Sequence, residues 1–250
     1  MEAEIAGLLP PGLSAVAAAV LIATAAVTSF LTAAVGVGGG VVLLAVMAVL
    51  VPPAALIPVH GVVQAGSNVG RTLVLRRHVR VGPLLGFGIG SLGGAALGGL
   101  IVVDLPPAWV RTGLGLFILY AVWGPKPDLG RAGLWLGGGV SSFLTMFFGA
   151  TGPFVATIVK RLEFDRLTHV GTFSACMSLQ HGIKIAAFGA LGFAFAPWLP
   201  LLAGMIASGF AGTLIGRQVL VRLQDRRFHR LLNIVLTLLA ARLVWAGLFG

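Results

Sequence analysis

The chain has 250 residues, of which 58% are hydrophobic and only 10% are charged. An ordinary soluble domain carries about 25% charged residues, so a soluble fold would leave too much apolar surface in contact with water. The formal net charge of +10 does not indicate a nucleic-acid-binding protein, because the basic residues lie in short segments between apolar runs. Cys176 is the only cysteine, which excludes an intramolecular disulfide and argues against a thiolate metal site.

Seven apolar runs reach or approach the ~20 residues that cross a bilayer as a helix. The start of the chain is acidic, unlike a secretory signal, so we expect the first run to belong to the mature protein. The pattern predicts an all-α polytopic protein with one integral membrane domain. The runs are Leu13–Val35, Ala54–Leu75, Val81–Val103, Ala108–Trp123, Leu167–Leu191, Trp198–Val221 and Leu231–Phe249.

The basic segments predict the orientation in the membrane, because cytoplasmic loops are enriched in Lys and Arg. We expect the cytoplasmic segments to be Arg76–Arg80, Lys126–Arg131, Lys160–Arg166 and Arg222–Arg230. Both termini and the turns Asp104–Pro107 and Gly192–Pro197 carry little positive charge and should face the periplasm.

The same order of segments occurs twice, in residues 1–124 and 125–250. Each half has a long apolar run, a glycine-rich break, a short apolar segment and three longer runs. The breaks are Gly36–Gly40 and Phe148–Pro153, and the short segments are Val41–Val51 and Phe154–Lys160. Each half has an odd number of segments, so the second should enter from the opposite side, as in the inverted-topology repeats of many secondary transporters.

Small residues in the two halves also match at a constant offset of 118 positions. Small residues four positions apart line one face of a membrane helix and let another helix approach closely. We therefore expect these residues to pack helices together, and a bulky substitution such as Gly94→Leu to impair folding. The matched sets are Gly86, Gly90, Gly94, Gly98 and Gly204, Ser208, Gly212, Gly216.

The two short segments would rise only ~17 and ~10 Å as helices, too little to cross a hydrocarbon core of ~30 Å. We interpret them as half-helices whose N-termini present free N–H groups and a positive dipole end, which favour an anion. Thr151 is the predicted N-cap of the second, and Pro153 suits its first turn. Gly39, Gly40, Thr151 and Gly152 should line the binding cavity, although the glycines of the two breaks could instead serve only helix packing or kinking.

Polar residues at membrane depth indicate function, since burying them in lipid is costly. One face of the third segment carries His60, Gln64, Ser67, Asn68 and Arg71, and its counterpart carries Ser174, Ser178, His181 and Lys184. Two alternatives stay open: the two cations could snorkel to the interface, and the histidines could simply bond a neighbouring helix. The predicted substrate-binding residues are Gly38, Gly39, Gly40, His60, Gln64, Asn68, Arg71, Thr151, Gly152, Ser174, Ser178, His181 and Lys184.

All seven acidic residues fall in termini or connecting loops, and none lies within an apolar run. This argues against a cation transporter or a carboxylate proton relay, both of which usually place acids in the membrane. An anionic substrate would supply the missing counter-ion for a buried cation.

Three segments together resemble the sulfite exporter TauE/SafE family: the Gly38–Gly40 break, the helix start Pro58–Asn68 and the second break Gly149–Pro153. The resemblance covers nearly the whole chain, including its length and its two halves. It implies an inner-membrane permease, an exporter of small sulfur-containing anions such as sulfite, sulfoacetate or other short sulfonates.

Two other function classes remain to be compared. A metal-ion or other small-solute permease would use His60, His169 and His181, but the missing acids count against it. An intramembrane enzyme lacks support, since no hydrolase or metalloprotease motif and no intramembrane carboxylate pair occurs. We predict no cofactor and no resident metal. The predicted partners are a small anion and the lipid bilayer.

Overall fold

A computed structural model describes residues 9–10, 12–35, 38–102, 106–125, 133–219 and 226–249. Within these ranges the chain forms ten α-helices and two short 3-10 helices, and no strand. The sequence-based assignments for Met1–Glu4, Asp104, Lys126–Arg131 and Arg222–Asp225 lie outside the described residues.

The helices follow the predicted apolar runs to within a few residues, and both predicted short segments are separate short helices. The first half has α2 (Ala15–Val35), α3 (Gly39–Leu50), α4 (Pro53–Val74), the 3-10 helix η1 (Arg76–His78), α5 (Gly82–Val102) and α6 (Pro107–Trp123). The second half has α7 (Gly133–Phe148), α8 (Gly152–Lys160), α9 (Arg166–Ala190), η3 (Ala196–Trp198), α10 (Leu199–Val219) and α11 (Arg226–Leu248).

Three described helical segments, Ala15–Ala34, Gly82–Val102 and Ala196–Gln218, are long and apolar enough to cross a membrane by length and composition. Helices α4 and α9 are as long, with 22 and 25 residues, but each buries several polar side chains. Their polar faces point into the protein, so their lower hydropathy reflects an internal position in the bundle.

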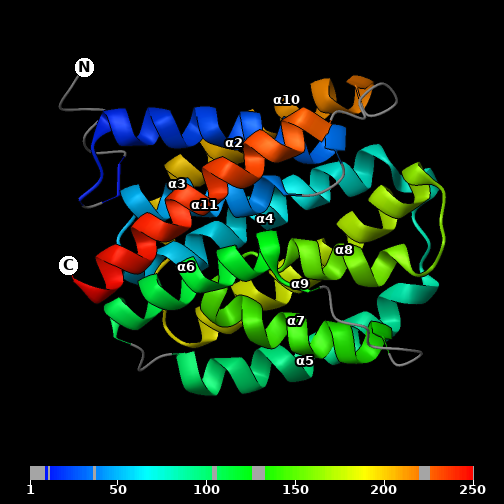
Figure 1. The fold of residues 1–250 in the computed structure, drawn as a ribbon. Helices are drawn as coiled ribbons and strands as arrows, with labels where there is room; N and C mark the ends of the chain where they lie inside the picture. Colours follow the sequence, from blue (N-terminus) through cyan, green and yellow to red (C-terminus); the bar gives the residue numbers. More distant parts are fainter. Residues whose placement is uncertain are drawn as a thin grey trace.

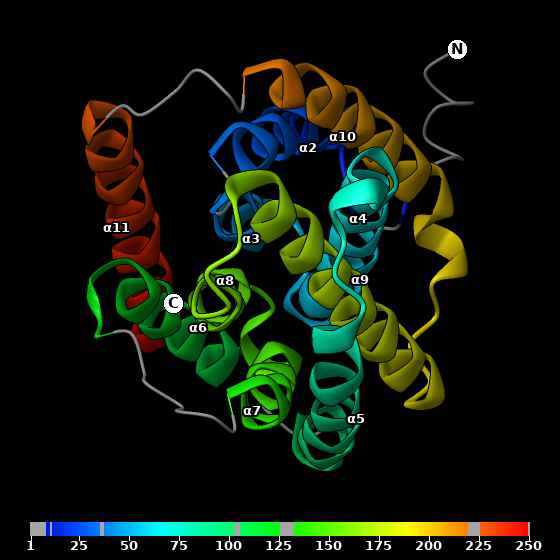
Figure 2. The ribbon, with the colours of Figure 1, turned by 90° about the vertical axis from the view of Figure 1, so that its right-hand side faces the viewer.

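The helices form a bundle in which pairs of outer helices surround an inner group (Figure 1). Viewed along the helices, α2 lies beside α10, α5 beside α7, α6 beside α11 and α4 beside α9, while α3 and α8 lie between these pairs (Figure 2). The start of α2 and the end of α11 lie at the same end of the bundle (Figure 1).

Small residues set the closest outer contacts, as predicted for the glycine ladder. A Cβ on Gly94 would overlap the carbonyl oxygen of Gly139 on α7, and one on Gly212 would overlap that of Ala26 on α2. Ser208 replaces a glycine in this series and donates a hydrogen bond of 2.8 Å to the carbonyl of Ile22. The expected packing role is therefore confirmed for these positions.

Basic residues gather at one end of the bundle. Arg217 at the end of α10 borders the same pocket as Arg76, Arg77 and His78 of η1. Arg166 at the start of α9 donates a hydrogen bond of 3.1 Å to the carbonyl of Ala34 near the end of α2. The end of α10, η1 and the start of α9 therefore lie at the same end of the bundle.

Candidate functional site

The N-termini of the two half-helices meet at one cavity inside the bundle. Gly38 and Gly40 border it from the α3 side, and Gly152 and Pro153 border it from the α8 side. The cavity has a volume of about 30 Å³. Its other lining residues are Thr32, Val41, His60, Gln64, Asn68, Ala150, Phe173, Met177 and His181.

Each break depends on a glycine with a left-handed backbone, at Gly38 (φ 107°) and Gly149 (φ 75°). Other residues pay a steric penalty in this region, so glycine lets the chain turn sharply from the long helix into the half-helix. Neither α3 nor α8 has a side-chain hydrogen bond at its N-cap. In contrast, Asp165 accepts from the N–H groups of Leu167 and Thr168 and caps α9.

Thr151 occupies the N-cap position of α8, but its hydroxyl does not cap the helix. It donates instead to Oε1 of Gln180 at 3.0 Å. The Gln180 amide in turn donates to the hydroxyls of Ser141 at 2.8 Å and Ser142 at 3.0 Å. Thr151 is therefore the N-cap residue by position, as predicted, but its hydroxyl ties the α8 tip to α9 and α7.

Gly39 and Gly40 of the first break face different neighbours. A Cβ on Gly39 would overlap the carbonyl oxygen of Thr28, so Gly39 packs against α2 and does not border the cavity. Gly40 borders the cavity, and its Cβ would lie 3.0 Å from Oε1 of Gln64. Gly152, on the opposite tip, leaves more space: its Cβ would lie 3.7 Å from Phe173.

Two buried histidines face one another at the cavity. The rings of His60 on α4 and His181 on α9 lie edge to face, with centroids 6.2 Å apart. His60 Nε2 lies 3.0 Å from the carbonyl oxygen of Gly40, on the α3 tip. The Nδ1 atoms of both rings are buried without a hydrogen-bond partner.

Arg71 lies in the last turn of α4, with its side chain directed into the protein beside Asn68. Its guanidinium donates to Asn68 Oδ1 at 2.9 Å, to Ser67 Oγ at 2.9 Å and to Ser174 Oγ at 3.4 Å. The side chain is 2% exposed, and its Nε has no partner. Arg71 therefore does not snorkel to the interface.

Lys184 is the second buried cation, with no exposed surface. Its Nζ donates to the carbonyl of Gly149 at 3.3 Å and lies 3.5 Å from Oγ1 of Thr145. The stem of Lys184 passes close to Gly61, where a Cβ would come within 2.7 Å of Cε. The ammonium therefore contacts the second break directly and does not snorkel.

The two predicted serines on α9 lie differently. Ser174 is buried beside Arg71. Ser178 donates to the carbonyl of Ser174 and lies 3.4 Å from the hydroxyl of Thr72, so it joins α9 to α4 away from the cavity.

Gln180 and Thr145 were not among the residues predicted from the sequence. The polar cluster around His181 was the available signal for Gln180, whereas nothing local distinguished Thr145.

The three histidines of the metal-permease alternative do not converge. His169 stacks on Phe173 with ring centroids 6.5 Å apart. It precedes His181 by 12 positions on α9, a rise of ~18 Å along the helix. Among the described residues, no three His, Cys, Asp or Glu side chains form a group that could hold a metal ion.

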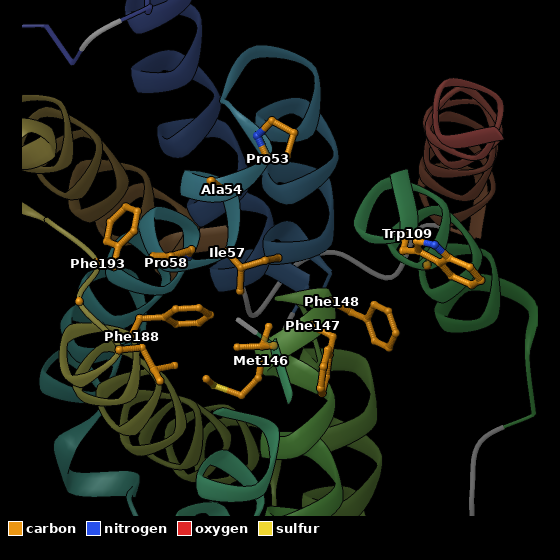
Figure 3. A pocket seen from close by; sticks show the side chains of 14 residues that line it. Pro53, Ala54, Ile57, Pro58, Trp109, Met146, Phe147, Phe148, Phe188 and Phe193 are labelled. Atoms are coloured by element: carbon orange, nitrogen blue, oxygen red, sulfur yellow. The ribbon is translucent and has the colours of Figure 1, made fainter. Parts of the chain in front are cut away.

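A second, larger cavity of about 490 Å³ lies toward the end of the bundle opposite the basic residues. Phe188, Ile57 and Met146 surround the same space in Figure 3. None of its 14 lining residues is charged. We call this larger cavity the vestibule. Phe148 borders the vestibule and Ala150 borders the small cavity, so the second break separates the two spaces.

Comparison with known proteins places these features in a family. A sequence model of the sulfite exporter TauE/SafE family matches residues 21–243. The chain belongs to this family. TauE/SafE proteins are membrane permeases for sulfur anions, so the protein is a membrane transporter and not an enzyme. The match includes both breaks and all the residues around the small cavity. No curated protein matches the chain.

Proposed function

We propose that this TauE/SafE protein exports small sulfur-containing anions, such as sulfite, sulfoacetate or other short sulfonates, by alternating access. One observation carries the proposal: the cavity between the two half-helix tips is backed by two buried cations and bordered by neutral polar groups. The tips offer N–H groups without side-chain caps. Gly38, Gly40 and Gly152 let an anion approach that backbone, while His60, Gln64, Asn68 and His181 supply side-chain contacts.

The charges around the cavity favour an anion over a cation. Arg71 and Lys184 are both buried, and no acidic side chain lies within a described helix. The described acids, Glu163 and Asp165, lie in the loop between α8 and α9. A cation in the cavity would meet two positive helix ends and two cations, whereas an anion would compensate all four.

Equivalent contacts in the two halves support an inverted repeat with the cavity at its centre. Helices α3 and α4 begin 113 positions before α8 and α9, and Arg71 precedes Lys184 by the same number of positions. The hydroxyls of Ser29 and Ser67 lie 2.9 Å apart. The corresponding residues, Ser142 and Gln180, are joined by a bond of 3.0 Å. Alternating access would then exchange the environments of the two halves.

The size of the cavity indicates a contracted conformation. A volume of about 30 Å³ suffices for about two water molecules, since one needs ~10–15 Å³ by this measure. Sulfite or a sulfonate would require the α3 and α8 tips to move apart. The second break separates the cavity from the vestibule, so its movement would open the path toward that end.

Ligand-dependent stability of the purified protein tests the proposed substrate class. A ligand that binds only the folded state raises its stability by about 2.7 kcal/mol at a hundredfold excess over Kd. Sulfite, sulfoacetate or methanesulfonate should therefore raise Tm, and proteoliposomes should take up the same anions. Protection by divalent metals or organic cations, with none by small anions, would contradict the proposal.

We further propose that the basic end of the bundle faces the cytoplasm and both termini face the periplasm. The grouping of Arg76, Arg77 and Arg217 at one end supports this orientation. A cysteine introduced at Arg77 in a Cys176→Ala background should react with an impermeant thiol reagent only after the cells are opened. Strong labelling in intact cells would reverse the assignment.

A further inference from the structure

The His60–His181 pair is the buried titratable cluster that anion binding alone leaves unexplained. We propose that His60 accepts a proton at Nδ1 together with each anion, so that the transporter is an anion–proton symporter. This inference rests on the proposed function. It names a second ligand, a proton, and assigns it to one atom.

The hydrogen bond to Gly40 determines which nitrogen can accept that proton. Nε2 of His60 lies 3.0 Å from the Gly40 carbonyl oxygen. A carbonyl oxygen can only accept, so Nε2 carries the hydrogen in the neutral ring and Nδ1 keeps its lone pair. That Nδ1 is buried and has no partner in the protein. His60 is therefore oriented as a base, with its other nitrogen bonded to the α3 tip.

The charges facing the pair make protonation depend on the anion. His60 has the His181 ring on one side and the positive Lys184 nearby. His181 in turn has the His60 ring and Lys184 as neighbours. Arg71 lies further along α4, and its guanidinium is bonded to Asn68 and Ser67. The facing groups from the other elements are neutral: Gly40 on α3, Thr32 on α2, Thr145 on α7 and Gly152 on α8.

Without an anion, a proton on His60 would add a third positive charge to a site that already holds Lys184 and Arg71. An anion in the cavity compensates that charge, so each ligand strengthens the binding of the other, reciprocally. Imidazole suits this role because its charge ordinarily changes between pH 5 and 8. The imidazolium would also strengthen the bond to Gly40, because charge-assisted hydrogen bonds are the stronger ones.

The transport step balances without any redox partner. On one side of the membrane a proton from water forms an N–H bond at His60 Nδ1, and the anion binds at the half-helix tips. After the conformational change, the N–H bond breaks, the proton returns to water and the anion leaves. A monovalent anion is then carried without net charge, and the pair leaves the cell when the outward anion gradient exceeds the inward proton gradient.

Proteoliposomes with a pH-sensitive dye inside test the coupling. Methanesulfonate is a suitable probe because it stays ionised and carries no proton of its own. Sulfite is measured in parallel, with protein-free liposomes as the baseline. For wild type, inward flux of the anion should acidify the lumen, and an acidic exterior should speed anion uptake. Addition of methanesulfonate to purified protein in weak buffer should also raise the pH, because the protein takes up protons.

His60→Gln is the decisive variant, because an amide N–H can still donate to Gly40 but cannot accept a proton. Its uptake should be slower and should lose its stimulation by external acid. His169→Gln, a histidine outside the cavity, should retain wild-type stimulation. Anion uptake by wild type without acidification would overturn the coupling and leave the proposed function standing. Coupling that persists in His60→Gln, or that requires an added metal ion, would overturn the assignment. Uptake of neither anion would instead defeat the proposed function.

Discussion

Arg71 and Lys184, which lie 113 positions apart in the sequence, are both buried cations but have different surroundings. The Arg71 guanidinium has three side-chain partners, from Ser67, Asn68 and Ser174. The Lys184 ammonium has only longer contacts, at 3.3 Å to Gly149 and 3.5 Å to Thr145. The comparison indicates that Arg71 mainly holds α4 and α9 together, whereas Lys184 retains donors for an anion at the second break.

The two half-helix tips differ in the same way. Gly39 and Gly152 are the first residues of α3 and α8, yet a Cβ would overlap the Thr28 carbonyl at Gly39 and would make an ordinary contact of 3.7 Å at Gly152. The α3 tip is thus packed firmly against α2, and the α8 tip has more room. Alternating access would then involve larger movements of the second tip than of the first.

The largest expected effect is a loss of protein stability when a side chain is added at the α3 tip but not at the α8 tip. Gly39→Ala should destabilise the protein by ~3 kcal/mol or more, because the backbone of α2 cannot move aside cheaply. Because the Cβ would overlap the Thr28 carbonyl, a larger side chain at Gly39 should likewise cause a folding defect and not merely block transport. Thermal unfolding in detergent and the yield of monodisperse protein provide the measurement.

Gly152→Ala is the matched control. It should unfold within ~1 kcal/mol of wild type while reducing anion uptake, since its methyl group would enter the cavity. Equal loss of stability in both variants would mean that the two tips are packed alike.

The second prediction concerns the cations. Lys184→Gln should remove at least half of the Tm increase produced by methanesulfonate, because it replaces a charged donor near the anion with a neutral one. Arg71→Gln should instead lower the Tm of the ligand-free protein, corresponding to ~1–3 kcal/mol, because it leaves buried hydroxyl and amide groups unpaired. If the two variants exchanged these phenotypes, Arg71 would be the anion-binding cation.

A smaller effect is expected at the link between Thr151 and Gln180. Thr151→Val keeps the shape of the side chain and removes the donor to Gln180 Oε1, so stability should fall by ~1 kcal/mol. Thr157→Val removes a hydroxyl that bonds within α8, to the Pro153 carbonyl, and should cost less. Chemical or thermal unfolding of both variants compares the two hydroxyls, and equal costs would argue that the Gln180 network adds nothing.

The smallest effect should come from the cap of α9, which contrasts with the uncapped half-helices. Hydrogen bonds from Thr168, with a further one from Leu167, hold the pKa of Asp165 below its ordinary value. The stability from this carboxylate is therefore present above its ordinary pKa and is lost as the pH falls through the lowered value. Asp165→Ala should lower Tm slightly at pH 7 and have less effect near pH 3. A Tm difference independent of pH would argue against a charged cap.

Most of the fold could be predicted from local sequence. Runs of apolar residues gave the helices, and their length separated α3 and α8 from the spanning helices because the rise per residue is constant. The glycine ladder predicted the close contacts of α5 and α10, since small residues at a spacing of four share one helix face.

The tertiary structure decided which polar residues meet. Gly39 and Gly40 are adjacent and chemically identical, but Gly39 packs against α2 whereas Gly40 borders the small cavity. Only the position of α2 distinguishes them. The burial of Arg71 and Lys184 depended on partners more than 30 positions away in sequence, such as Thr145 and Ser174. Periodicity places a residue on a helix face, but the helix that covers that face is set by packing of the whole bundle, because its contacts join segments distant in the chain.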